Sequence, residues 1–235
     1  VIKIMKKRKR NRNKQIKALL CAITICILCA ATFAVFGSSE GSGDQEQNTV
    51  SWILVGDSYS VRPKSDPEKT WPKQLQSMLG LEDSEVCIIQ KPGYGFARTD
   101  KNFYTVFKEL ESSKNVKYIV IQSGPRNDRK SSRKAIHKKI KSTAKLIKKK
   151  FPNAKVFYAT PNWNNVSKKQ QTMLKARKKW YRKYAKEAGW IYLGSVQDIF
   201  VNETGWTEED GHHPNKRGVK ILSKAMYKAI SKYVK

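Results

Sequence analysis

Three side chains in this sequence have the types and the order needed for catalysis by a serine hydroxyl. Ser58 follows a short apolar run, and Asp210 lies three residues before His213. A serine hydroxyl is a weak nucleophile at neutral pH, so it needs a base within hydrogen-bond reach and a carboxylate that orients this base. We expect His213 to be the base and Asp210 to hold the ring nitrogen that faces away from Ser58.

Attack on an acyl group also needs hydrogen-bond donors for the negative charge that develops on the substrate oxygen. Three groups are candidates: the backbone N–H of Ser58, a backbone N–H in a glycine-rich turn, and the side-chain amide of Asn127. Within the turn we expect Gly95 to supply the donor, with Gly93 as the alternative.

The elements that must position these residues follow an alternating pattern. From residue 50 onward, apolar β-type runs alternate with helical patterns, and the runs are nearly continuous, as in strands that are covered on both faces. Strands are predicted at Val50–Val55, Glu85–Gln90, Val116–Gln122, Ala154–Thr160 and Trp190–Leu193, and helices at Trp71–Leu79, Asp100–Ser112, Ser131–Lys149, Lys168–Ala188 and Asn215–Val234. The pattern predicts one α/β domain, residues 50–235, with a parallel sheet of about five strands and helices on both faces.

In such a sheet, functional side chains stand on the loops after the carboxyl ends of the strands. Ser58 follows the first predicted strand, the two glycines the second and Asn127 the third, while Asp210 and His213 precede the last helix. All of them therefore fall at the same edge of the sheet. Each motif alone is also common in turns and helix caps, but four of them in this order favour a catalytic site.

The same motifs resemble the four blocks of the SGNH hydrolases, also called GDSL-type esterases and lipases, and the resemblance covers the whole of residues 50–235. Gly56-Asp57-Ser58-Tyr59 is similar to the first block, and Gly95, Asn127 and the run from Asp210 to His213 are similar to the second, third and last. The resemblance implies a flavodoxin-like three-layer α/β/α sandwich. It also implies a catalytic triad of Ser58, Asp210 and His213 with an oxyanion hole formed by Ser58, Gly95 and Asn127.

Two positions depart from the pattern of that family. Its third block is usually G-x-N-D, whereas here Pro125 stands in place of the glycine and Gly124 lies one residue earlier. The first block has Tyr59 where the GDSL name has leucine, at a position that the wider family varies. Neither departure removes a chemical group, and the first bears on where Asn127 is placed.

The chain is strongly basic, with a formal net charge of +29. The first 17 residues hold 9 of the 48 basic residues and no acidic one, which leaves 39 basic and 19 acidic residues after them. An excess of this size indicates contact with polyanions such as nucleic acid, anionic lipid or anionic cell-surface polymers.

A charge-free segment, residues 18–36, favours the last two kinds of partner. Its 19 residues would span about 28 Å as a helix, which is enough to cross a bilayer. Because basic residues precede it, residues 1–17 are expected in the cytoplasm, residues 37–49 form a flexible linker, and the domain lies outside the cell. A cleaved signal peptide, and hence a secreted domain, is the alternative. Either location makes nucleic acid an improbable partner.

Cysteines and histidines are too few to predict a disulfide or a metal site in the outer part. Three of the four cysteines fall in the apolar segment, which leaves Cys87 alone in a run that is expected to be buried, and the chain has only three histidines. We therefore expect no metal and no cofactor. His137 lies in a very basic helical stretch and is expected to be a solvated surface residue.

The expected activity is hydrolysis of O-acyl esters through an acyl-enzyme, with acetyl groups on a cell-envelope polysaccharide as substrate. Trp163 and Asn162 follow the fourth strand and Trp206 precedes the Asp210 turn, so these side chains could contact a sugar. One alternative is an O-acetyltransferase that uses the same triad. The other is a non-catalytic module whose basic surface binds cell-wall polyanions.

Overall fold

The computed structural model describes residues 49–161, 167–200 and 203–234. They belong to the second of the two units, 1–47 and 48–235, into which the chain divides. The predicted cytoplasmic and membrane-spanning segments lie outside the described residues, as does the linker up to residue 48. Within the described ranges, no helix has the length and apolar character needed to cross a membrane.

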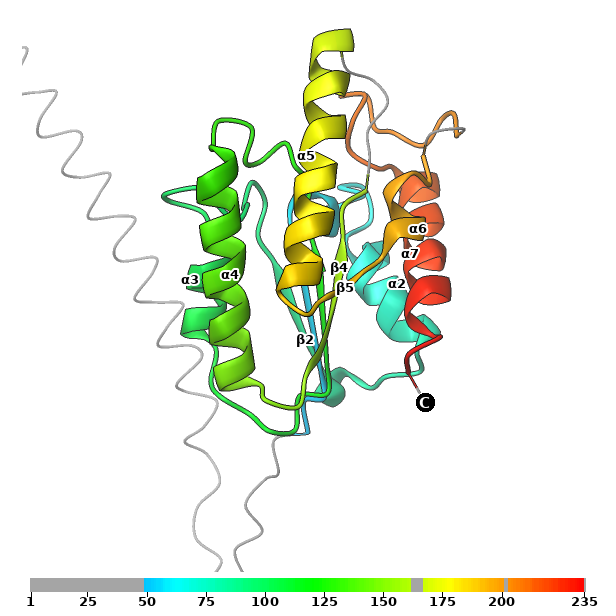
Figure 1. The fold of residues 1–235 in the computed structure, drawn as a ribbon. Helices are drawn as coiled ribbons and strands as arrows, with labels where there is room; N and C mark the ends of the chain where they lie inside the picture. The colour runs from blue at the N-terminus through cyan, green and yellow to red at the C-terminus, as the bar shows by residue number, and fades with distance from the viewer. Residues whose placement is uncertain (1–48, 162–166, 201–202, 235) are drawn as a thin grey trace, which may run out of the picture. The chain divides into compact units, whose positions relative to one another are not determined.

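A parallel sheet of five strands forms the centre of the domain (Figure 1). The strand order is β2-β1-β3-β4-β5. The bounds are Trp52–Gly56 for β1, Val86–Gln90 for β2, Tyr118–Gln122 for β3, Lys155–Ala159 for β4 and Ile191–Tyr192 for β5. All pairs are parallel, which confirms the predicted sheet. Their carboxyl ends therefore lie along one edge.

Helices cover both faces of the sheet and complete a three-layer α/β/α sandwich (Figure 1). One face carries α2 (Trp71–Met78), α6 (Gly194–Gln197) and α7 (Lys216–Ile230), and the other carries α3 (Phe103–Glu109), α4 (Arg133–Lys150) and α5 (Lys168–Glu187). Alternate residues of β1 serve the two cores: Trp52 and Leu54 pack with α2 and α7, while Ile53 and Val55 pack with α3 and α4. Burial on both faces explains the continuous apolar runs of the central strands.

Helix α7 ends before the position expected from the sequence. Asn215 caps its start by accepting a hydrogen bond from the N–H of Gly218 at 3.1 Å, and the apolar stripe of Val219, Leu222, Met226 and Ile230 is buried. Tyr233, expected on the same stripe, lies beyond the end of the helix and is 42% exposed. The buried apolar residues up to Ile230 are thus enough to dock α7 beside α2.

The shortest elements differ most from the expectation. Strand β5 has only two residues because it pairs with just Phe157 and Tyr158 of β4. The four-residue helix α6 and a 3₁₀ turn at Ser58–Val61 are too short to leave a periodic pattern in the sequence. Cys87, expected to be buried, is partly exposed because β2 is an edge strand.

Candidate active site

Ser58 stands at the carboxyl end of β1, at the start of the 3₁₀ turn Ser58–Val61. Asp57 caps this turn, and its carboxylate accepts a hydrogen bond from the N–H of Tyr59 at 3.0 Å. Gly56 makes the sharp change of direction possible, because a Cβ at this position would lie 2.4 Å from the Cβ of Ser60. The turn thus holds the Ser58 hydroxyl at the edge of the sheet.

The triad expected from the sequence is assembled in the structure. The Ser58 Oγ lies 2.9 Å from His213 Nε2, and His213 Nδ1 lies 2.6 Å from Asp210 Oδ2. The other oxygen of Asp210 accepts the backbone N–H groups of His212 and His213, at 3.0 and 2.9 Å. The carboxylate is therefore held by the same turn that carries the base.

The charges in this chain of hydrogen bonds are those that a proton transfer requires. The pKa of His213 lies below its usual value, because burial of the ring disfavours the charged form more than the Asp210 hydrogen bond favours it. Burial of Asp210 acts to raise its pKa, but the hydrogen bonds from His213 and His212 outweigh this and hold the pKa well below the usual range. At neutral pH, a neutral imidazole thus faces the hydroxyl and a carboxylate orients it.

For the glycine donor of the oxyanion hole, the structure reverses the expected preference of Gly95 over Gly93. The Gly95 N–H donates to the carbonyl of Lys101 at 3.1 Å, and a Cβ at Gly95 would lie 2.5 Å from Asp128 Oδ1. Gly95 is therefore needed for close packing, and its N–H is already engaged. Gly93 lines the cavity in front of Ser58 and has a φ of +77°, so the structure favours Gly93 as the glycine donor.

Asn127 lies in the same cavity, as expected from the sequence. Its Nδ2 donates to Asp57 Oδ2 at 3.1 Å and to the carbonyl of Tyr94 at 2.7 Å. These two contacts fix the amide between the first and second loops. An oxyanion in the cavity would take one of these hydrogens or share it.

Asp57 connects two of the active-site loops, a role that the sequence did not indicate. Its buried carboxylate accepts hydrogen bonds from Tyr59 N, Gln122 Nε2, Gly124 N and Asn127 Nδ2, at 2.8 to 3.1 Å. Burial raises the pKa of Asp57, and the hydrogen bonds from Gly124, Tyr59 and Gln122 offset part of that effect. The residue therefore positions the first and third loops relative to each other.

The cavity in front of Ser58 has a volume of about 250 Å³. Its lining includes Ser58, His213, Gly93 and Asn127, so a nucleophile, a base and two candidate oxyanion donors meet in one space. This is smaller than the usual 300 Å³ or more of a drug-sized ligand site. The space suits a small acyl group.

No protein-family model and no curated protein matches this sequence. Among solved structures, the chain is similar to TesA (17% identity, TM-score 0.60, covering 77% of this chain and 98% of that one). It is also similar to the esterase EstA from Pseudoalteromonas sp. (17%, TM-score 0.56, 78% and 98%). A protein from Slackia heliotrinireducens assigned to the SGNH hydrolases gives 14% identity and a TM-score of 0.57, over 77% and 98%. The fold is that of the SGNH hydrolases.

A neighbour within the SGNH fold acts on a carbohydrate. The family two carbohydrate esterase from Clostridium thermocellum, in complex with cellohexaose, has 13% identity to this chain and a TM-score of 0.59. The match covers 84% of this chain and 68% of the esterase. At these identities the similarity establishes the fold, and the chemistry must be argued from the side chains of this chain.

The residues after the proline that departs from the third SGNH block, Asn127 and Asp128, both contact the other active-site loops. Asp128, next to Asn127, is fully buried and accepts the N–H groups of Phe96 and Ala97 at 2.9 and 2.8 Å. It also accepts the hydroxyl of Tyr181 on α5. Asp128 thus ties the second and third loops together and helps to keep Asn127 at the cavity.

Two further residues at the triad were missed from the sequence. Arg62 forms an ion pair with Glu208 at 2.6 Å, and its Nη2 lies 3.4 Å from His213 Nδ1. The Tyr59 hydroxyl donates to the carbonyl of His212 at 2.8 Å, which joins the first loop to the turn before α7. Both lie within four residues of Ser58, and this closeness in the sequence was the one feature from which their role could have been predicted.

The side chains expected to contact a sugar are only partly among the described residues. Trp163 and Asn162 lie outside the described residues, so their role stays a prediction. Trp206 is only 4% exposed and stacks on Phe200 with ring centroids 3.9 Å apart. Trp206 therefore belongs to the core and is not available to a substrate.

Asp210, His212 and His213 are also close enough together to be considered as metal ligands. Each offers a ligand atom within 4.8 Å of the others. However, both oxygens of Asp210 and both ring nitrogens of His213 already take part in the hydrogen bonds of the triad. A metal would compete for the atoms on which the proton transfer depends.

Proposed function

We propose that this protein is a serine ester hydrolase that removes small O-acyl groups, acetyl groups first, from a cell-envelope polysaccharide. The observation that carries the proposal is the unbroken chain from Ser58 Oγ through His213 to Asp210, with distances of 2.9 and 2.6 Å. The lowered pKa of His213 supports the role of the ring as a base.

Each step of the proposed reaction uses a group of this site. His213 Nε2 accepts the Ser58 proton as Oγ bonds to the acyl carbon, and donors at Ser58 N, Gly93 N and Asn127 receive the charge on the carbonyl oxygen. The bond from the acyl carbon to the alkoxy oxygen then breaks, and the protonated His213 gives its proton to the leaving alcohol. Water, deprotonated by His213, hydrolyses the acyl-enzyme in the same way.

The cavity and the fold neighbours support the choice of substrate. A space of about 250 Å³ fits an acetyl group better than a long acyl chain. A carbohydrate esterase with this fold binds cellohexaose, which supports a glycan as the carrier of the ester. The same triad would serve an O-acetyltransferase if a sugar hydroxyl replaced water as the acceptor.

The test is ester cleavage by the purified protein, measured as acetate release from an acetylated polysaccharide. Ser58→Ala is expected to lower turnover by at least 1,000-fold, while the surface variant Ser231→Ala keeps native turnover. A parallel assay with an acetyl donor and an unacetylated glycan separates hydrolysis from transfer. Native turnover by Ser58→Ala would show that the site is not a nucleophile centre and would favour the non-catalytic binding module.

We also propose that residues 18–36 hold the domain at the outer face of the cell membrane. The support is the charge-free length of this segment and the basic residues before it. The expected result is that the native protein stays with membranes after carbonate extraction and that external protease digests the domain in intact cells. Release into the carbonate wash, or protection from the protease, would contradict the proposal.

A further inference from the structure

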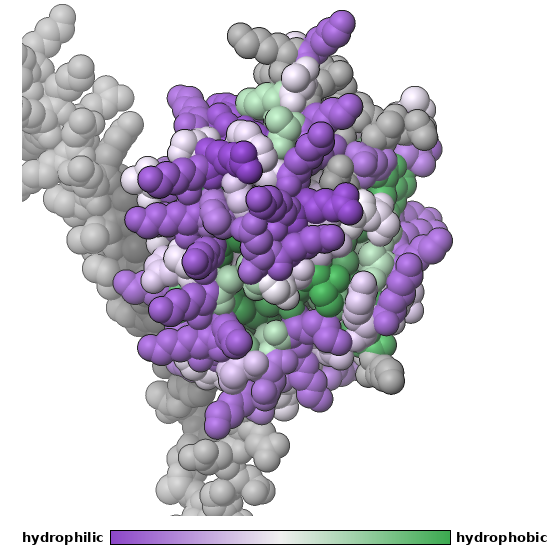
Figure 2. Space-filling model, viewed as in Figure 1, coloured by the Kyte–Doolittle hydropathy of each residue, from purple (hydrophilic) through white to green (hydrophobic). Residues whose placement is uncertain are grey.

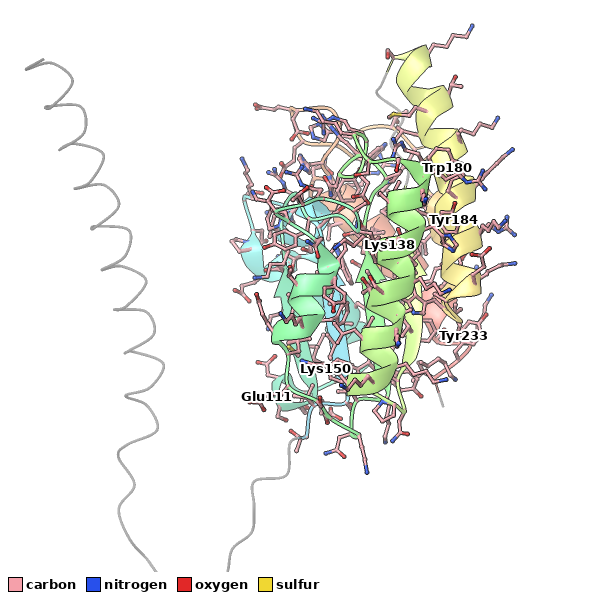
Figure 3. All side chains as sticks on the ribbon, turned by 60° about the vertical axis from the view of Figure 1, so that its left-hand side comes forward. Glu111, Lys138, Lys150, Trp180, Tyr184 and Tyr233 are labelled. Atoms are coloured by element: carbon pink, nitrogen blue, oxygen red, sulfur yellow. The ribbon has the colours of Figure 1, made fainter. Side chains whose placement is uncertain are left out.

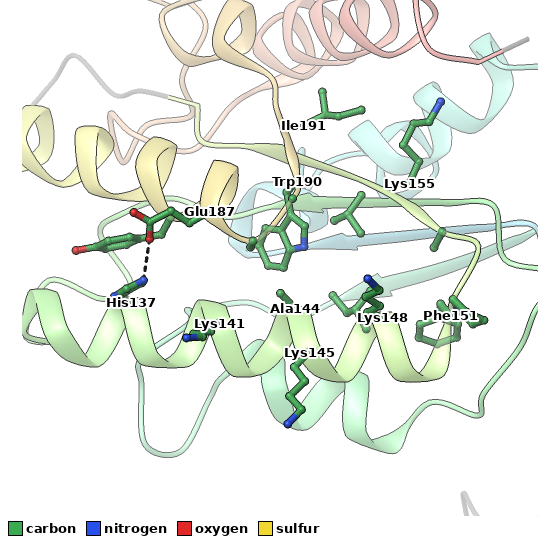
Figure 4. Close-up of a pocket in the computed structure, with 17 residues that line it drawn as sticks. His137, Lys141, Ala144, Lys145, Lys148, Phe151, Lys155, Glu187, Trp190 and Ile191 are labelled. Carbon is green, nitrogen blue, oxygen red and sulfur yellow. Dashed lines mark ion pairs between the residues drawn. The ribbon is translucent and has the colours of Figure 1, made fainter.

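A second, larger cavity lies between α4, the end of α5 and the start of β4 (Figure 4). Its volume is about 770 Å³, and none of the described residues that line it lines the Ser58 cavity. The residues of β4 at its edge, Lys155 and Val156, are the first two of the strand. The groove is thus far along the strands from the carboxyl ends that carry the triad.

The groove exists because the layers do not close over its apolar floor. Figure 4 shows Trp190 directed toward Ala144 of α4. Ala188, the residue after α5, adds a second small side chain to the lining. Strand β5 pairs only with Phe157 and Tyr158, so in the described structure it leaves the start of β4 uncovered. The result is a hollow whose floor is apolar.

The rim of this hollow is positively charged. Lys141, Lys145 and Lys148 from α4 line it, and all three are exposed. Lys155 of β4 also lines the hollow, but its Nζ donates a hydrogen bond to the carbonyl of Tyr233 at 3.1 Å. The one acidic lining residue that the structure describes, Glu187, pairs with His137 at 2.8 Å and with Lys183 at 3.7 Å. The carboxylate of Glu187 thus already has partners on α4 and α5. Figure 2 shows the same combination of hydrophilic side chains around apolar surface.

The lysines of α4 form a row. Lysine recurs at alternating spacings of four and three residues, which places the side chains on one stripe about 21 Å long: Lys134, Lys138, Lys141, Lys145 and Lys148. Figure 3 shows α4 beside α5, with Lys138 and Lys150 toward its two ends. Helix α4 contains no acidic residue, and like charges one turn apart destabilise a helix. The row is therefore a cost to the fold, which a ligand would explain.

We propose that this groove binds a linear anionic polymer with phosphodiester groups, which lies along α4. Ammonium groups are point charges that suit phosphate oxygens, and a row of them matches an anion that repeats along a chain rather than one compact anion. The apolar floor would receive the uncharged part of the repeating unit. A bilayer is flat and would meet the crests of the helices, which would leave the hollow between them empty.

The test measures binding of a synthetic, fluorescently labelled poly(glycerol phosphate) to the full-length protein by anisotropy. In Lys141→Gln/Lys145→Gln/Lys148→Gln, Kd is expected to rise at least tenfold, and the slope of log Kd against log salt to become shallower by about two. The matched control, Lys220→Gln/Lys224→Gln/Lys228→Gln on α7, removes the same charge from exposed lysines on the other face. It should change Kd less than threefold.

A variant that leaves the charge unchanged tests the hollow itself. Ala144→Trp fills the space beside Trp190 and is expected to raise Kd at least fivefold, with thermal unfolding used to confirm that the variant is folded. Equal effects of the two lysine variants, or native binding by Ala144→Trp, would overturn the proposal. It would also be overturned if the groove variants lost binding to anionic phosphatidylglycerol vesicles but kept binding to the polymer.

Discussion

At the scale of single residues, catalysis requires His213 to be neutral when it accepts the proton of Ser58. Burial and the charge of Arg62 both lower its pKa, while Asp210 raises it. Arg62 is held in place by Glu208, so the positive charge beside the ring is fixed. The pH dependence of activity therefore reports on Arg62 as well as on the triad.

We predict that kcat/KM rises with pH as His213 loses its proton, with a midpoint below the usual histidine value of about 6.5. Arg62→Gln removes a positive charge beside the imidazolium and leaves Glu208 unpaired, and both changes favour the protonated ring. The midpoint should therefore move to higher pH. Arg98→Gln, which affects only a surface ion pair with Asp100, should leave it unchanged. A midpoint that stays or falls in Arg62→Gln would refute this role of Arg62.

Alanine substitutions at the two glycines of the second loop are predicted to have different effects, one on turnover and the other on stability. Gly93→Ala has open space for its methyl group but an unfavourable φ of +77°, so it should cost about 1 kcal/mol and lower kcat by tenfold or more through a displaced N–H. Gly95→Ala places a Cβ 2.5 Å from the Asp128 carboxylate and should mainly lower stability. Urea unfolding and turnover per folded molecule separate the two. A stable, inactive Gly95→Ala would restore Gly95 as the donor.

The residues that the sequence did not reveal act through contacts with distant parts of the chain. Ser58, Asn127, Asp210 and His213 carry the chemical groups that catalysis needs, so their types and order were sufficient. Choosing between the two glycines needed the partner of the Gly95 N–H, which is the carbonyl of Lys101, six residues away. Arg62 matters only because the turn before α7 folds back onto it.

At the scale of elements, the docking of α7 decides where the Asp210 turn lies. Asn215 caps the helix and donates to the carbonyls of Gly205 and Thr207 at 3.1 and 2.8 Å. Gly218 lies against the backbone of Trp206, and a Cβ there would be 2.2 Å from the carbonyl oxygen. The helix can approach the preceding loop only because this position has no side chain.

Gly218→Ala is therefore predicted to destabilise the protein by about 1–3 kcal/mol, although alanine is usually the better residue inside a helix. Gly194→Ala is the matched control, because a Cβ at this start of α6 meets nothing closer than 3.8 Å. Its free energy of unfolding should stay within about 0.5 kcal/mol of native. Equal free energies of unfolding of the two variants in urea would contradict this role of Gly218 in packing.

The elements that could be predicted are those whose burial leaves a pattern. The central strands are covered on both faces, and the long helices carry an apolar stripe, so both could be recognised. The 3₁₀ turn after β1 and helix α6 are set by backbone hydrogen bonds over four residues each. Such short elements have no periodicity to detect, and the end of α7 depended on tertiary contacts.

At the scale of the whole molecule, the excess of positive charge is a property separate from any single site. After residue 17, the chain carries 39 basic and 19 acidic residues. Repulsion among the excess positive charges destabilises the compact state, and dissolved salt screens this repulsion. The same charge draws the protein toward polyanions from a distance.

Thermal stability is predicted to rise with salt. Between 20 and 300 mM NaCl, about 1 kcal/mol of relieved repulsion would raise Tm by about 2–4 °C in calorimetry. The triple lysine variants of α4 and α7 should both reduce the dependence of Tm on salt, because long-range repulsion depends on the number of charges more than on their positions. A Tm that falls over this salt range would contradict the expectation.

Covalent labelling shows directly whether Ser58 is the nucleophile. Incubation with a fluorophosphonate and digestion should give one modified peptide, the one that contains Ser58, at one label per molecule. Labelling should fall at least 100-fold in His213→Ala, since the hydroxyl then lacks its base, and should be unchanged in His137→Ala. An active native enzyme that gains no label at Ser58, or gains it at another serine, would contradict the account.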